Sequence, residues 1–496
     1  MTGFQFKTTP FPHQLDIFNT RRDFEGDAIF AEQGTGKTKI VLDNVADLYL
    51  RGKVNGLLVL APRGVAENWV TDEIPVHLCD AVAKETRSYC WKSPRSSTKR
   101  QQAEEKALLE HRGLSVVALG YEAFVTKAGK EFAKKFLLSR KTFYALDEAT
   151  RIKTPGAKRT KTVIASAKYA PYRRILTGTP VTNGPFDIYS PVRFTHPTFW
   201  KEHGLGDYYA FKTQFGVFEK GWNGQTGREF DALVGFQNLD LLSRLLAKIS
   251  VRVSKDVLNL PPKLYARRYY DPSPEQKRMY NQLLAEFMTF LGDGREVNAP
   301  LAIVRLLRLQ QVLCGYVPVQ NLTEDADGYL HIDNELILLE DNPRLDELME
   351  VVEDTFAKTI IWARFTQDID LICARLAAAG ASFVRYDGKV SDKDRLANKQ
   401  AFQDGDAQFF VANPAAAGEG LTLHAAETVI YYNNTFKLSE RLQSEDRAHR
   451  AGLTHSVNYI DLVAKDTMDI DVLEALRDKI RVASIITRDR IREWVL

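Results

Sequence analysis

The sequence predicts an α/β protein with two parallel-sheet units and helical segments between them. Three observations support this: short apolar strands alternate with helical stretches in both halves, a proline-containing linker separates the halves, and the chain has 496 residues. At roughly 100–200 residues per domain, this length fits about two to four folded units. With 44% hydrophobic and 26% charged residues, the composition excludes a disordered chain.

Short apolar strands that end in small or polar residues recur along the chain. Strands alternating with helical stretches favour a parallel sheet, because each helical crossover returns the chain to the same edge. The expected strands of the first half are 28–31, 57–61, 143–146 and 174–176. Those of the second half are 360–363, 382–386, 409–412, 429–432 and 459–463.

The middle of the chain carries a helical pattern, with apolar residues three and four positions apart. The segments with this pattern are 239–257, 275–291, 301–312 and 344–352. Two prolines in Leu260-Pro261-Pro262-Lys263 break any helix and suit a stiff extended linker. The predicted domains are a first lobe at 1–258 with a helical insertion at about 190–258, a linker and helical insertion of the second lobe at 259–350, and the second lobe at 351–496.

Charge and cysteine usage exclude several classes of protein. Lys and Arg total 67 and Asp and Glu total 64, a net charge of +3, so a polyanionic partner must be held by a local patch. The four cysteines are scattered without a C-x-x-C pair, which argues against a disulfide framework and a structural zinc site. Apolar runs fall far short of the roughly 20 residues that span a bilayer. Residues 1–10 lack the features of a signal peptide, so a cytoplasmic location is expected.

Residues 31–38 read A-E-Q-G-T-G-K-T between an apolar strand and a helical stretch, the context of a phosphate-binding loop. Glycines let the backbone approach phosphate oxygens, and amides at a helix start donate to them. Lys37 adds positive charge and Thr38 can ligate Mg²⁺, although Ala31 replaces the usual first glycine. The expected nucleotide-binding residues of this loop are Gln33, Gly34, Thr35, Gly36, Lys37 and Thr38.

Two further groups have the chemistry of phosphoryl transfer. Asp147 and Glu148 follow a strand, where Asp147 would hold Mg²⁺ and Glu148 would polarise the attacking water. Near the C-terminus, Q-S-E-D-R-A-H-R-A-G places Arg447 and Arg450 three residues apart on one expected helical face. Either arginine could stabilise charge on the transferring phosphoryl group.

The order of these motifs resembles that of superfamily 2 helicases, in the SWI/SNF-like branch of ATP-dependent DNA translocases. Besides the phosphate loop and Asp147-Glu148-Ala149-Thr150, three segments closely match that branch. They are L-T-G-T-P at 176–180, L-P-P-K at 260–263 and Q-x-x-D-R-x-H-R-x-G at 443–452. Two positions depart from the pattern: Thr150 stands at a usual His, and Glu419 replaces a Gly in A-G-E-G-L at 417–421.

The resemblance implies two tandem RecA-like P-loop domains with helical insertions, which use ATP and Mg²⁺. It implies that Gln14 reads adenine, that Gly420 contacts the nucleotide, and that Gln443 acts with the two arginines in catalysis. Residues implied to couple hydrolysis to movement are Thr177, Gly178 and Thr179. Candidates for contact with the nucleic-acid backbone are Arg63, Arg364 and Thr422.

The leading hypothesis is an ATP-dependent translocase that moves along duplex DNA and remodels DNA structures or displaces bound proteins. One alternative is a helicase that unwinds branched DNA or RNA, and another is a nucleotide-gated DNA clamp that recruits a partner. The expected form is a monomer without membrane contact, and a protein partner could supply targeting. A nucleoid or nuclear location also fits.

Overall fold

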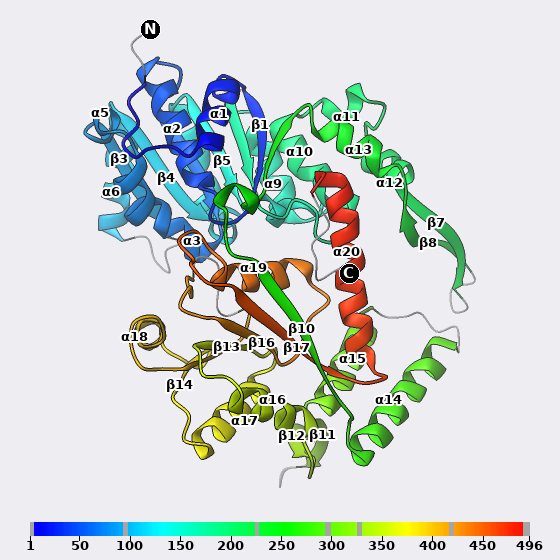
Figure 1. Ribbon diagram of the computed structural model, residues 1–496. Helices are drawn as coiled ribbons and strands as arrows, with labels where there is room; N and C mark the ends of the chain where they lie inside the picture. Colours follow the sequence, from blue (N-terminus) through cyan, green and yellow to red (C-terminus); the bar gives the residue numbers. More distant parts are fainter. Residues whose placement is uncertain are drawn as a thin grey trace. The chain divides into compact units, whose positions relative to one another are not determined.

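The computed structural model describes residues 4–92, 98–223, 228–292, 299–324, 330–415 and 421–489. The chain divides into two compact units, each described here by itself. The first comprises 1–217, 235–260 and 479–492, and the second comprises 218–234, 261–478 and 493–496. Each unit contains a parallel sheet with helices around it (Figure 1), which confirms the predicted α/β fold class.

The sheet of the first unit has seven strands in the order β3-β4-β2-β5-β6-β1-β9. All neighbouring strands are parallel. The strands are β1 (Gly26–Ala31), β2 (Gly56–Ala61), β3 (Thr86–Trp91), β4 (Leu114–Gly120), β5 (Thr142–Asp147), β6 (Tyr172–Leu176) and β9 (Ser250–Val253). The four strands expected in this half are confirmed, and β3, β4 and β9 extend the sheet at its two edges and beside β2.

Apolar residues cover both faces of this sheet, because successive side chains of a strand point to opposite faces. In β2, Leu58 and Leu60 pack in one cluster, whereas Leu57 and Val59 pack in the other. The helical segments of this part of the chain are α1 (Pro12–Arg21), α2 (Lys37–Leu50), α3 (Arg63–Asn68), η1 (Trp69–Glu73), α4 (Ile74–His77), α5 (Asp80–Ala83), α6 (Lys99–Glu110), α7 (Tyr121–Phe124), α8 (Lys127–Ser139), η2 (Ala149–Ile152), α9 (Lys158–Ala167), η3 (Pro185–Ile188), α10 (Tyr189–Thr195), α11 (Phe199–Glu202), α12 (Tyr208–Phe215), α13 (Leu239–Leu246) and η4 (Lys255–Leu258).

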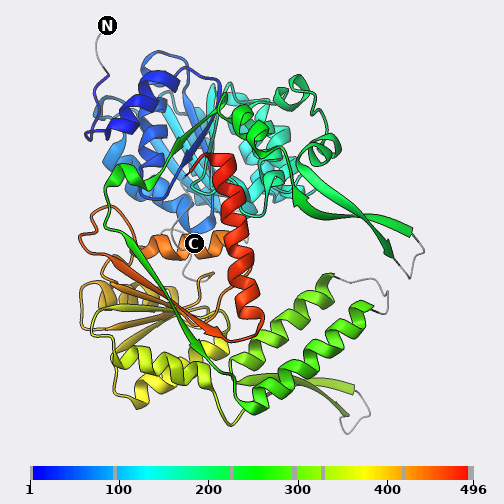
Figure 2. The same cartoon turned by 45° about the vertical axis from the view of Figure 1, so that its right-hand side comes forward.

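The expected helical segment 239–257 is helical only in its first part. Helix α13 ends at Leu246, and Ser250–Val253 instead forms β9, which pairs in parallel with β1. Pairing at the open edge of the sheet outweighs the helical spacing of the apolar residues here. The stretch expected as a helical insertion also contains β7 (Gly216–Asn223) and β8 (Arg228–Phe236), which pair only with each other and form a long ribbon in both views (Figures 1 and 2).

The sheet of the second unit has six parallel strands in the order β10-β17-β16-β13-β15-β14. The strands are β10 (Lys263–Tyr270), β13 (Thr359–Trp362), β14 (Phe383–Tyr386), β15 (Phe409–Ala412), β16 (Thr428–Tyr431) and β17 (Val457–Ala464). All five strands expected in this half are confirmed. Figure 2 shows the additional strand β10 lying along β17 at the sheet edge, so the chain after the two prolines becomes part of the sheet.

Helices, the β11–β12 hairpin and most of the β7–β8 ribbon complete the second unit. The helices are α14 (Pro274–Gly292), α15 (Ala299–Leu313), α16 (Pro343–Glu353), α17 (Thr366–Ala378), α18 (Asp392–Gln403), α19 (Leu438–Ala448) and the first part of α20 (Met468–Thr487), whose residues from Lys479 onward belong to the first unit. Helices α14 and α15 lie side by side in both views (Figures 1 and 2). The expected helical insertion also includes the antiparallel hairpin of β11 (Tyr316–Glu324) and β12 (Leu330–Leu338).

The described part of the chain contains no helix that is long and apolar enough to cross a membrane. Within the same residues, no group of three or more His, Cys, Asp or Glu side chains could hold a metal ion. Cys79, Cys90, Cys314 and Cys373 are all free thiols, consistent with their scatter in the sequence.

A buried arginine at the start of α16 gives a test of the second unit's stability. Arg344 forms an ion pair with Asp469 and donates to Tyr270 and to the Tyr432 carbonyl, at 2.6 and 2.7 Å. Arg344→Met would leave the Asp469 carboxylate buried without its cation, so we expect a loss of about 3–5 kcal/mol in the free energy of unfolding. Arg375→Met, which breaks a half-exposed pair with Asp346, should cost less than about 1 kcal/mol. Urea unfolding of both variants would measure the difference, and equal losses would contradict it.

Candidate functional site

The segment after β1 has the backbone of a phosphate-binding loop. Gly34 and Gly36 have φ angles of 84° and 82°, in the left-handed region that glycine adopts without strain. A Cβ atom on Gly36 would lie 2.1 Å from Gln14 Nε2, so the loop and the Gln14 side chain are closely packed. Gly36 caps α2, whose first amides therefore lie at the end of the loop, where a helix N-terminus favours an anion.

Lys37 and Gln14, two predicted nucleotide-binding residues, both contact this loop. Lys37 Nζ donates to the Ala31 carbonyl oxygen at 2.9 Å. Gln14 Nε2 donates to the Thr35 carbonyl oxygen at 3.1 Å, and Gln14 Oε1 accepts from the Phe11 amide at 2.9 Å. The side chain expected to read adenine is therefore bonded directly to the loop expected to hold the phosphates.

Asp147 lies at the carboxyl end of β5, two strands from β1 in the sheet. Its Oδ2 accepts from Trp69 Nε1 at 2.9 Å, and its Oδ1 accepts from the Glu148 amide at 3.1 Å. Burial raises the pKa of the Asp147 carboxyl, and the positive charge of Lys37 opposes that rise. A buried carboxylate of this kind fits a hard divalent cation, with the hydroxyl of Thr38 as a second candidate ligand.

Glu148 has a backbone that non-glycine residues rarely adopt, with φ 50° and ψ 57°. Thr177, the first threonine of L-T-G-T-P, donates from Oγ1 to Glu148 Oε2 at 3.4 Å. The Thr179 amide donates to the same Thr177 oxygen at 3.1 Å. Thr150 stands where the family pattern has a His, and in this chain it is Thr177 that contacts Glu148.

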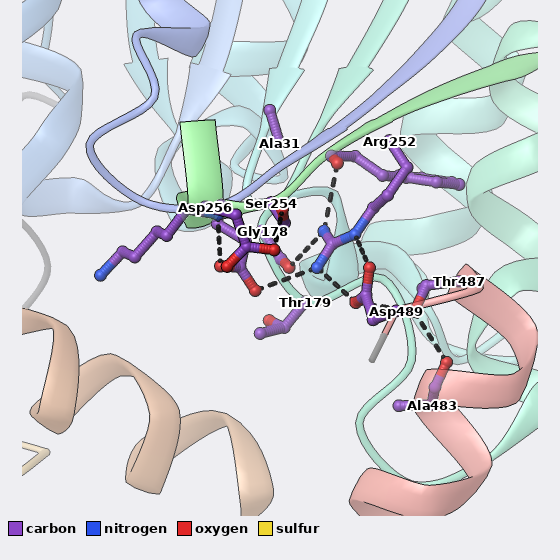
Figure 3. Close-up of polar contacts among 12 residues, drawn as sticks. Ala31, Gly178, Thr179, Arg252, Ser254, Asp256, Ala483, Thr487 and Asp489 are labelled. Carbon is purple, nitrogen blue, oxygen red and sulfur yellow. Dashed lines mark hydrogen bonds and ion pairs between the residues drawn. The ribbon is translucent and has the colours of Figure 1, made fainter. Parts of the chain in front are cut away.

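Arg252, on β9, joins several of these elements and was not among the predicted site residues (Figure 3). One terminal nitrogen, Nη1, donates to the carbonyl oxygens of Phe30 and Gly178, both at 3.1 Å. The other, Nη2, lies 3.0 Å from Glu32 Oε1 and 2.6 Å from Asp489 Oδ2. In the sequence, the one indication of this role is that an arginine stands in the short segment S-V-R-V. The sequence does not show which residues this arginine contacts.

In the second unit, Arg447 and Arg450 converge on one backbone carbonyl. Arg447 Nη1 lies 3.2 Å and Arg450 Nη1 3.4 Å from the Leu421 oxygen, and Arg450 also donates to Thr422 Oγ1 at 2.5 Å. The expectation that both lie on one helical face is wrong, because α19 ends at Ala448 and His449 is extended. The turn after the helix, not the helical spacing, brings Arg450 beside Arg447.

The remaining predicted residues lie in varied surroundings. Gln443 is half-buried on α19, and Gly420 lies outside the described residues. Arg63 is exposed at the start of α3, whereas Arg364 is half-buried and donates to Gln310, and burial lowers its pKa. The nucleic-acid contacts assigned to Arg63, Arg364 and Thr422 stay predictions.

The family profile described as the SNF2-related domain matches residues 19–314, more than half of the chain. The chain belongs to the SNF2-related family. A second profile, the helicase conserved C-terminal domain, matches residues 343–452. Together these matches cover the first sheet and all of the second sheet except β17, and they confirm the resemblance that the motifs indicated.

Several curated relatives of this SNF2-related protein share about a quarter of its residues. The "Probable chromatin-remodeling complex ATPase chain" of Oryza sativa is 25% identical over 93% of this chain and 39% of its own length. "Transcription regulatory protein SNF2" of Saccharomyces cerevisiae is 25% identical over 91% and 26%. An "Uncharacterized ATP-dependent helicase" of Mycoplasma pneumoniae is 23% identical over 92% and 40%. The chain thus spans less than half the length of these relatives.

Among solved structures, the "Sulfolobus solfataricus SWI2/SNF2 ATPase core in complex with dsDNA" is similar to this chain. The match has a TM-score of 0.41 and 22% sequence identity, and it covers 99% of this chain and 95% of that one.

The contact between Thr177 and Glu148 gives a prediction for hydrolysis. Thr177→Val removes the hydroxyl that orients the Glu148 carboxylate, so we expect kcat for ATP to fall about tenfold, corresponding to about 1.4 kcal/mol. The KM for ATP should stay within about twofold, because the Thr177 hydroxyl bonds to Glu148 and the Thr179 amide, which lie outside the phosphate loop. Steady-state kinetics would measure both constants. Thr213→Val, at an exposed position on α12, is the control, and an unchanged kcat in Thr177→Val would contradict the orienting role.

The raised pKa of Asp147 gives a prediction for stability. The folded protein holds this proton more tightly than the unfolded chain, so the carboxyl's contribution to stability decreases as pH rises above about 4. Asp147→Asn removes this dependence, and the variant without nucleotide or Mg²⁺ should unfold at a higher temperature than wild type near pH 7. Thermal unfolding from pH 5 to pH 8 would test this, with Asp404→Asn, an exposed carboxyl, as control. A lower unfolding temperature for Asp147→Asn at pH 7 would contradict the prediction.

Proposed function

We propose that this protein is an ATP-driven motor that moves along double-stranded DNA and remodels DNA structures or displaces bound proteins. The observation that carries the proposal is the convergence of Lys37, Asp147, Glu148 and Thr177 within the first unit. Lys37 supplies a positive charge for the phosphates, Asp147 a metal ligand and Glu148 a base. Thr177 belongs to the predicted coupling segment, residues 177–179. The family membership of the chain supports the same activity.

In this proposal, each residue acts through the contacts described above. Amides at the start of α2 and Lys37 would bind the phosphates, and Thr38 and Asp147 would hold Mg²⁺, which when bound neutralises phosphate charge. Glu148 orients the attacking water and takes its proton, and Thr177 fixes the Glu148 carboxylate. Arg447 and Arg450 of the second unit would complete the site when the units close around ATP.

Movement would follow from that closure. The lobes would grip the nucleic acid by its phosphate backbone, through residues such as Arg63, Arg364 and Thr422. Backbone contacts carry no sequence information, so they suit a motor that must pass over any sequence, and they weaken as salt rises. We also propose that the motor works as a monomer and that a protein partner or a DNA structure directs it to its target.

A second candidate function, strand unwinding, is favoured by one feature of the β7–β8 ribbon. Trp222 is 66% exposed and Phe230 is 51% exposed, so the ribbon carries aromatic faces on which nucleic-acid bases could stack. The ribbon could separate strands as the motor advances.

The test of the proposed function is steady-state ATP hydrolysis without nucleic acid and with duplex DNA, single-stranded DNA or RNA. We expect duplex DNA to stimulate turnover at least tenfold, and Glu148→Gln and Lys37→Ala to abolish it. A triplex-displacement assay and a strand-separation assay would then distinguish translocation from unwinding. Strand separation that is lost in Trp222→Ala would favour the helicase. Nucleotide-dependent DNA binding without turnover would overturn the motor in favour of a clamp.

A further inference from the structure

The segment between β9 and β10, residues 254–262, is short and conformationally restricted; we call it the connector. It contains the single turn η4 (Lys255–Leu258), then Asn259 in the left-handed region at φ 48° and ψ 45°, and then Pro261 and Pro262. Each proline fixes its own φ angle and restricts the residue before it. The connector is therefore stiffer than a flexible tether of the same length.

In the first unit, the start of the connector is bonded to the residue that opens the phosphate loop. Glu32 Oε2 accepts from the Lys255 amide at 3.0 Å, and the Glu32 amide donates to the Val253 carbonyl oxygen at 3.0 Å. Glu32 Oε1 meanwhile lies 3.0 Å from Arg252 Nη2. Three contacts thus tie Glu32 to the chain just before and within the connector.

Arg252 extends this attachment to the predicted coupling segment, residues 177–179, and to Asp489, just after α20 (Figure 3). Its Nη1 donates to the Gly178 carbonyl oxygen of L-T-G-T-P, and its Nε and Nη2 both bond to the Asp489 carboxylate, at 2.8 and 2.6 Å. A bidentate Arg–carboxylate pair holds the guanidinium in one orientation. The start of the connector is therefore attached to the phosphate loop and to the coupling segment at once.

In the second unit, the end of the connector is bonded to α19, which bears Arg447, and to the residue that follows this helix. His449 Nε2 lies 2.8 Å from the Pro261 carbonyl oxygen. Lys263 Nζ lies 2.7 Å from Glu445 Oε2, on the preceding turn of α19. The L-P-P-K segment thus contacts α19 at Glu445 and the residue that follows the helix at His449, two residues before and two residues after Arg447.

The Lys263–Glu445 pair belongs to a buried cluster. The Glu445 side chain has no solvent exposure, and it also accepts from Tyr265 at 2.9 Å and from Arg441 Nε at 2.9 Å. Burial alone would raise the pKa of Glu445, but the charges of Lys263 and Arg441 outweigh it and hold the pKa at about 2. A buried carboxylate held this way restricts the position of α19 closely, because any shift would separate the buried charge from its partners.

We propose that the connector is a rigid coupling element whose two ends are fastened to nucleotide-site elements, and that Arg252 and Lys263 are the positioning residues that fasten it. The proposal rests on the proposed function. Arg252 acts through Glu32 and Gly178, and Lys263 acts through Glu445 on the helix that carries Arg447. Movement of one unit relative to the other would then reach the phosphate loop and the catalytic arginines through the connector. A flexible tether would only limit how far apart the units can travel.

The decisive experiment inserts two glycines after Asn259 in the full-length protein. This leaves every contact of Arg252, Lys263 and His449 chemically possible but removes the fixed length and stiffness between them. We expect duplex-stimulated kcat to fall at least tenfold, while the KM for ATP and the thermal unfolding temperature stay close to wild type. The matched control inserts two glycines after Gly380, an exposed turn with open space around it, and should retain wild-type kcat.

A second pair of variants keeps the proposal testable if the insertion fails to fold. Lys263→Met should lower kcat at least tenfold with little change in the KM for ATP, and Lys263→Arg, which preserves the charge, should restore at least a third of wild-type kcat. If the insertion folds and hydrolyses ATP like wild type, the connector is a tether and the proposal is overturned. If Lys263→Met changes only the unfolding temperature, Lys263 is structural and the proposal is likewise overturned. Failure of the wild-type protein to respond to duplex DNA would instead overturn the proposed function.

Discussion

The first unit's candidate site depends on one constraint, the parallel pairing of β5, β6 and β1 in adjacent positions. The carboxyl ends of parallel strands lie at the same edge of a sheet, so the segments that follow these strands must meet there. The phosphate loop follows β1, Asp147 ends β5, and L-T-G-T-P begins at the end of β6. Residues more than a hundred positions apart in the sequence are thus brought together by backbone hydrogen bonds rather than by contacts of their own side chains.

That constraint explains which features could be predicted from the sequence. The strand leading into the phosphate loop and the one ending at Asp147 are apolar because both of their faces are covered, so their composition alone identifies them. β9 was missed because its four residues include a serine and an arginine and follow a helix with strong apolar spacing. Its strand conformation comes from pairing with β1, which only the folded chain provides.

Side-chain roles that depend on contacts with residues far apart in the sequence could not be predicted from the sequence either. The Trp69 indole donates a hydrogen bond to Asp147 across a sequence separation of 78 residues. Arg252 reaches Gly178 and Asp489 in the same way. In contrast, the glycines of the phosphate loop were predictable, because their φ angles near 80° are a local requirement that the sequence itself satisfies.

The unusual backbone conformation of Glu148 is part of the same arrangement at the edge of the first sheet. A non-glycine residue at φ 50° costs of order 1–3 kcal/mol and persists only where the surroundings hold it. Here the Asp147 carboxylate accepts a hydrogen bond from the Glu148 amide, and Thr177 donates one to the Glu148 side chain. The conformation turns Glu148 toward the coupling segment instead of along the strand direction. The strain therefore places the proposed base, Glu148, beside the Thr177 hydroxyl at the sheet edge, at a cost that the buried strands of the first unit offset through their packing.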